Sequence, residues 1–103
     1  MEFSRFSFTK FTVTVADPAV FTSAAHELYT DDTVVLETTG ALPAGLAVKT
    51  TYYVVYNGIT ADTFQLSTLK GGTPIVTTGT QSGTHTFLKT NRARLVANVE
   101  NNK

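Results

Sequence analysis

The sequence predicts an all-β fold, a small sandwich or barrel of about six to seven short strands in a single domain. Threonine is the commonest residue, with 20 copies among 103 residues. With valine, tyrosine and phenylalanine it makes a composition that favours strands. Alanine, leucine, glutamate and lysine are too sparse for long surface helices. The length and a hydrophobic content of 42% suit one domain, residues 1–103, that closes a single core.

The first predicted strand lies within residues 6–15, where the alternation changes phase. Two aromatic residues occupy even positions, Phe6 and Phe8, and three apolar residues occupy odd positions, Phe11, Val13 and Val15. A half-buried strand cannot slip by one residue without reversing its faces. We therefore expect either a break or bulge near Thr9-Lys10, or an N-terminal arm over residues 1–9 that is distinct from the first strand. Asp17-Pro18 should end the run, because proline donates no ladder hydrogen bond.

The remaining elements follow from alternation and from turn residues. Further strands are predicted at residues 33–38, 50–56, 63–67, 75–77 and 84–89. Turns are predicted at residues 23–26, 57–58, 71–72 and 79–83, and an ordered loop at 40–45, mostly where glycine or asparagine tolerates positive φ. In the predicted strand at residues 63–67, Phe64 and Leu66 should point inward. Residues 92–99 fit either a last strand or a short helix, and residues 100–103 should be a frayed polar tail.

Composition argues against several classes of function. Eight basic and eight acidic residues give a formal net charge of zero, whereas a nucleic-acid binder usually carries a basic excess. The absence of cysteine excludes disulfides, thiolate zinc sites and cysteine nucleophiles. No apolar run approaches the roughly 20 residues that cross a bilayer, and the N-terminus lacks the apolar region of a secretory signal. We expect neither a nucleic-acid nor a membrane partner.

The charges are unevenly distributed along the chain. The first half has an acidic bias, from Asp17, Glu27, Asp31, Asp32 and Glu37, and the C-terminal tail has a basic one, from Lys89, Arg92, Arg94 and Lys103. Ordinary solvated surface explains this distribution. Head-to-tail complementarity between neighbouring copies explains it as well.

No pattern in the sequence predicts catalysis, a metal or a cofactor. His26 and His85 lack partners at metal-ligand spacing, so structural hydrogen bonds are expected of both. Adjacent carboxylates in an extended segment point to opposite faces, so Asp31-Asp32 should cap a turn rather than act as an acid/base pair. The loop at residues 40–45 has no following lysine or helix, unlike a phosphate loop. The run Ser82-Gly83-Thr84-His85 contains hydroxyls and an imidazole, but successive residues in an extended chain diverge, which disfavours nucleophilic catalysis.

The tyrosines leave two interpretations open. Tyr52, Tyr53 and Tyr56 could stack on sugars or bases. Without a basic groove, packing in the core and across strands is the favoured use of these side chains.

Several short sequence motifs occur in an order that resembles a small β module of phage and prophage structural proteins. They are His26-Glu-Leu28, Thr33-Val-Val-Leu36, Thr39-Gly-Ala-Leu-Pro-Ala-Gly-Leu46, Thr51-Tyr-Tyr-Val-Val55, Asp62-Thr-Phe-Gln-Leu-Ser67, Gly71-Gly72 and Ser82-Gly-Thr-His-Thr86. The pattern is H-G-L…G-D-x-V…G-x-L-P-x-G-L…Y-Y-V…T-F-x-L-S…G-G…G-T-H, and it covers about 60 of the 103 residues. Glu27 and Asp31 stand where the pattern has glycine, a departure that affects the local turn but not the class.

The resemblance implies a non-catalytic virion protein, located in the virus particle and made in the host cytoplasm. A small β domain with an aromatic N-terminal arm suits a capsid decoration or cementing protein, and a tail, adaptor or fibre component is the alternative. Its partners would be the major capsid protein or tail components, and further copies of itself. The interface candidates are Phe3, Phe6, Phe8, Arg92 and Arg94, since aromatics dominate interface energetics. The phenylalanines could instead cover the domain's own core. A carbohydrate- or ligand-binding module is the alternative from another class.

Overall fold

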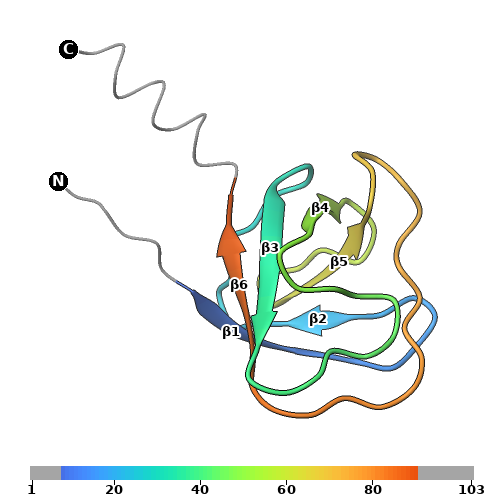
Figure 1. The fold of residues 1–103 in the computed structure, drawn as a ribbon. Coiled ribbons are helices and arrows are strands. Elements are labelled where there is room, and N and C mark those ends of the chain that lie inside the picture. The colour runs from blue at the N-terminus through green and yellow to red at the C-terminus, as the bar shows by residue number, and fades with distance from the viewer. Residues whose placement is uncertain (1–7, 91–103) are drawn as a thin grey trace, which may run out of the picture.

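Residues 8–90, the part of the chain that the computed structural model describes, form a closed barrel of six strands (Figure 1). In chain order these are β1 (Thr9–Val13), β2 (Phe21–Thr22), β3 (Thr33–Thr38), β4 (Thr51–Val55), β5 (Thr63–Ser67) and β6 (His85–Lys89). Around the barrel the order is β1-β2-β5-β4-β3-β6, and β6 pairs with β1. The all-β prediction is confirmed, and the fold is a barrel rather than a sandwich. Residues 8–90 contain no helix that is long and apolar enough to cross a membrane.

The first strand is shorter than predicted, because the chain turns away at Thr14. The Thr14 N–H donates to the Val20 carbonyl at 3.0 Å, and the Thr14 hydroxyl accepts from the Val20 N–H at 2.8 Å. These bonds close a loop between β1 and β2, so Val15 does not share the inward face of Phe11 and Val13 and is 45% exposed. At its other end β1 begins at Thr9, within the expected phase change.

The segment 75–77 is not a strand, which corrects the sequence prediction. The Ile75 N–H donates to the Leu66 carbonyl and the Thr77 N–H to the Ala16 carbonyl, at 2.8 and 3.0 Å. Because these partners belong to two different segments, neither forms a ladder with residues 75–77. The segment instead closes the barrel wall between β5 and the loop that follows β1.

Four phenylalanines from four strands fill the centre of the barrel. Phe21 stacks on Phe64 with ring centroids 5.3 Å apart, and Phe87 meets Phe64 edge-on at 5.8 Å. Phe11 packs against Phe21 at 5.5 Å. Phe64 and Leu66 are fully buried, as the alternation of β5 predicts. The core is therefore built from the inward-facing residues of every strand.

Two glycines let one end of the barrel close by backbone contact. A Cβ at Gly40 would lie 2.5 Å from the Ser82 carbonyl oxygen, and a Cβ at Gly83, whose φ is +81°, would lie 2.5 Å from the Gly40 nitrogen. The bridge between Ala41 and Ser82 forms beside them. The loop at residues 40–45 is thus ordered against residues 78–83, as expected.

Candidate functional site

Phe8 is the one predicted interface residue that the structure describes, and its ring does not belong to the core. It is 46% exposed and directly precedes β1. Phe3, Phe6, Arg92 and Arg94 lie outside residues 8–90. For Phe8 itself the structure excludes the interpretation that the ring completes the hydrophobic core.

The outer face of β1, β6 and β3 carries an apolar row beside Phe8. Phe8 directly precedes Thr9, whose partner Phe87 directly precedes Leu88, and Leu88 pairs with Val35 on β3. All three alternate with inward residues, so they point away from the core. Leu88 and Val35 are half-buried. Phe8, Leu88 and Val35 are named the apolar row below.

A second row on the same face carries charge. Lys10 pairs with Thr86, and Thr86 pairs with Glu37 on β3. Lys10 is exposed, and the Glu37 side chain is 33% exposed. Lys49 reaches Glu37 from the loop before β4, with 3.4 Å between Nζ and Oε2. Lys10, Thr86 and Glu37, named the charged row below, place a positive charge on β1 and a negative one on β3, with a neutral residue between them on β6.

The chain enters and leaves the barrel at the edge of this face. Thr9, the first residue of β1, pairs with Phe87, two residues before the end of β6 (Figure 1). Phe8 and Thr90 are accordingly the neighbouring ends of the described chain. Both ends of the described chain therefore lie beside the apolar row.

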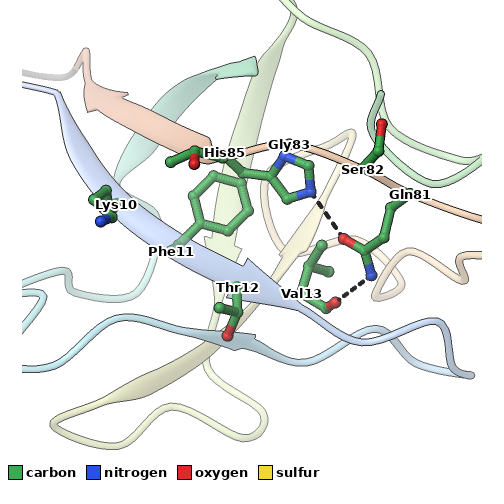
Figure 2. A pocket seen from close by; sticks show the side chains of 9 residues that line it. Lys10, Phe11, Thr12, Val13, Gln81, Ser82, Gly83 and His85 are labelled. Carbon is green, nitrogen blue, oxygen red and sulfur yellow. Dashed lines mark hydrogen bonds between the residues drawn. The ribbon is translucent and has the colours of Figure 1, made fainter. Parts of the chain in front are cut away.

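A hydrogen-bond relay centred on His85 fixes the opposite end of β1. The Thr38 hydroxyl lies 2.8 Å from His85 Nδ1, and His85 Nε2 lies 2.8 Å from Gln81 Oε1. The Gln81 amide donates to the Val13 carbonyl at 2.8 Å (Figure 2). An amide oxygen only accepts, so His85 carries its proton on Nε2 and accepts at Nδ1. Burial lowers the pKa of His85, which favours this neutral form.

A shallow hollow of about 390 Å³ lies between β1 and the loop before β6, and Figure 2 shows the residues around it. His85 and Phe11 form its inner wall, with ring centroids 5.7 Å apart. His85 Nδ1 is paired with Thr38 and His85 Nε2 with Gln81, so neither nitrogen is directed at the Ser82 hydroxyl. The imidazole thus has a structural role here, as the sequence predicted.

His26 has a similar structural role at the other end of the barrel. Its Nδ1 accepts from the Leu28 N–H at 2.8 Å, and its Nε2 lies 3.0 Å from the Thr63 carbonyl oxygen. The ring packs edge-on against Phe64 at 5.0 Å. The predicted structural hydrogen bonds of both histidines are confirmed. In the described range, no group of three or more His, Asp or Glu residues could hold a metal ion.

Asp32 organises the turn before β3, as the acidic pair predicts. The carboxylate accepts from the Tyr29 N–H at 2.9 Å and lies 3.3 Å from Lys89 Nζ. Asp32 is 2% exposed, so this ion pair joins the end of β6 to a turn through a buried acid. Asp31 itself adopts a positive φ of 74°.

The tyrosines divide between core and surface, so the packing prediction is correct for some and wrong for one. Tyr52 is buried, and its hydroxyl accepts from the Ala47 N–H at 2.8 Å. Tyr53 is half-buried on the outer face of β4. Tyr56 is 79% exposed, because β4 ends at Val55 and the chain turns there. Tyr29, which the sequence analysis did not single out, is 69% exposed.

Each exposed tyrosine borders a hollow. Tyr56 lines one of about 300 Å³ together with Asp31, Asn57 and Gly72. Tyr29 lines one of about 430 Å³ with residues of the 25–28 and 59–61 loops. The exposure of these two tyrosines cannot be predicted from sequence periodicity, since burial at a strand end depends on how the loops pack.

Comparison with known protein families, curated proteins and solved structures finds no match to this chain.

Proposed function

We propose that this chain is a non-catalytic structural protein of a phage-type virus particle, acting as a capsid decoration or cementing protein. A tail, adaptor or fibre component is the alternative within the same class. The observation that carries the proposal is the outer face of β1, β6 and β3. It combines an exposed aromatic ring, an apolar row and a charged row at the point where both ends of the described chain lie.

Backbone geometry supports the resemblance on which the proposal draws. The chain departs from the phage-module pattern at Glu27 and Asp31, where the pattern has glycine. Both residues adopt positive φ, 58° and 74°, a conformation that glycine adopts at little cost and other residues rarely adopt. The two departures thus fall at positions where a glycine suits the backbone.

A closed barrel also suits a protein that works through surface contacts. Within residues 8–90 closure pairs every strand on both sides, which leaves no free edge among these six strands for strand addition. Docking to a partner must then use side chains of the outer face or segments outside the barrel. Aromatic anchors that meet these conditions are typical of interface hot spots.

Binding to assembled particles tests the proposal. A cementing protein gains affinity by contacting several subunits of a lattice at once, so we expect far tighter binding to assembled particles than to isolated capsid subunits. Equal binding to both, or none to particles, would contradict the proposal. Cryo-electron microscopy of the intact particle would then distinguish a capsid from a tail location.

One pair of variants isolates the contribution of Phe8. Phe8→Ala should weaken particle binding at least about tenfold, because truncating an aromatic hot spot costs about 2 kcal/mol or more. Val15→Ala is the matched control, since Val15 is apolar and exposed to the same degree, 45% against 46%, beyond the other end of β1. Equal affinity of the two variants would remove Phe8 from the interface.

A carbohydrate-binding module is a second candidate, favoured by the exposure of Tyr56 and Tyr29. Sugar rings stack on exposed aromatic faces, and the hollow beside Tyr56 adds the carboxylate of Asp31 and the amide of Asn57. A glycan array with the purified full chain tests this candidate. Clear hits that Tyr56→Ala abolishes would favour it, and an array without hits would exclude it for the sugars tested.

A further inference from the structure

The strand order places β6 at the centre of the outer face, with β1 on one side and β3 on the other. The registers align Lys10, Thr86 and Glu37 in one row and Leu88 and Val35 in the other, and Phe8, one residue before β1, extends this second row. In the charged row the outer residues have opposite sign, and in the apolar row both outer residues are hydrophobic. On the two sides of β6, the charged row therefore has opposite charges, whereas the apolar row has a hydrophobic side chain on each side.

Such a face complements a copy of itself. Two copies packed face to face, with a twofold axis parallel to β6 between them, place β1 of one copy over β3 of the other. Lys10 then faces Glu37 of the second copy, and the same contact repeats on the other side of the axis. Phe8 faces Val35 of the second copy, and the two Leu88 side chains meet at the axis. Isologous contacts of this kind define the commonest class of homo-oligomer.

We propose that the outer face of β1, β6 and β3 is a twofold interface between two copies of this chain. The charged row indicates which partner packs on this face. A partner of uniform charge would be repelled by one end of this row, whereas a second copy presents the opposite charge at both ends. The Lys49 side chain in the Lys49–Glu37 pair is 76% exposed, and ion pairs of exposed lysines are weak, so Glu37 can also accept Lys10 of the second copy.

Charge reversal with rescue tests the interface on the full chain. Lys10→Glu and Glu37→Lys should each weaken self-association at least about tenfold in sedimentation velocity, because each places two like-charged pairs across the axis. Mixing the two variants should restore association as a heterodimer, in which every facing pair again has opposite sign. Lys70→Glu, an exposed lysine beyond β5, is the control and should associate like the wild type.

Crosslinking provides a second measurement that does not depend on charge. The chain has no cysteine, so Leu88→Cys introduces one thiol beside the axis. Stacked sheets lie about 10 Å apart, which a short bis-maleimide spans, and Leu88→Cys should crosslink to a dimer. Thr22→Cys, an exposed position on β2, should not.

The inference deepens the proposed assembly role, and its outcomes are separate from those of the particle-binding test. A wild type that is monomeric throughout the micromolar range overturns the interface and leaves particle binding to be decided by its own experiment. Single variants that associate like the wild type also overturn it. If Lys10→Glu and Glu37→Lys are each monomeric and do not associate when mixed, Lys10 does not face Glu37 of the second copy. Association with rescue, and a crosslink at position 88 but not at 22, supports it.

Discussion

Replacing Phe64 by alanine should remove a large part of the stability of the barrel. The ring is fully buried and contacts three other rings: Phe21 at 5.3 Å, Phe87 at 5.8 Å and His26 at 5.0 Å. Truncating a buried phenylalanine costs about 3–5 kcal/mol, and the loss of well-placed aromatic pairs puts this site at the upper end of that range. A domain of this size has only about 5–15 kcal/mol in total.

Urea unfolding measures the effect of this substitution. With a slope of about 1–2 kcal/mol/M for a small domain, a loss of about 4–5 kcal/mol shifts the midpoint by about 2–5 M. The slope itself should stay unchanged, since the surface exposed on unfolding is nearly the same. Tyr56→Ala is the control, because this side chain is 79% exposed and should change stability by less than about 0.5 kcal/mol. Similar midpoints for Phe64→Ala and the wild type would refute the assignment of Phe64 to the core.

Four further outcomes are expected. Because burial lowers the pKa of His85, the unfolded state binds the proton at a higher pH than the folded state does. As the pH falls below about 6.5, the free energy of unfolding should therefore decrease by at most about 1.4 kcal/mol per pH unit until the folded pKa is reached. Urea titrations across this range should show a smaller decrease for His85→Gln. Gly83→Ala should lower the melting temperature by several degrees, since φ is +81° and a Cβ meets a backbone nitrogen at 2.5 Å. Asp32→Asn should cost about 1–3 kcal/mol in urea unfolding, with the charge of Lys89 left without this partner. Deleting residues 2–8 should leave the melting temperature nearly unchanged while abolishing particle binding or self-association; a strongly destabilised monomer would contradict the anchor role.

Local sequence pattern was sufficient to predict the longer strands. β3 and β5 have the predicted bounds, because each alternates between turn residues that end it. β2 has only two residues, Phe21–Thr22, too few for any periodicity to appear. Residues 75–77 have strand-like composition, yet their hydrogen bonds go to two separate segments. Such partners are non-local, so the composition of the segment cannot reveal them.

The candidate interface was predictable only in part. Phe8 was identifiable because it occupies an even position and Phe11 an odd one, so the two cannot share one face of a strand. This difference is visible within a few neighbouring residues. The charged row could not be predicted, because Lys10 and Glu37 are aligned by the β1–β6 and β3–β6 registers. Register in a barrel depends on closure of the whole sheet, which no single segment encodes.

The pairing of β1 with β6 makes the described chain a nearly closed loop. Directly paired residues such as Thr9 and Phe87 lie about 4.5–5.5 Å apart between Cα atoms. A host protein could therefore carry this barrel within one of its surface loops, where the insertion would separate the flanking residues by little more than the width of one strand pair. The same proximity allows a short linker to join the ends and new termini to be opened at the Asn57-Gly58 turn, an exposed connection of the kind that tolerates circular permutation.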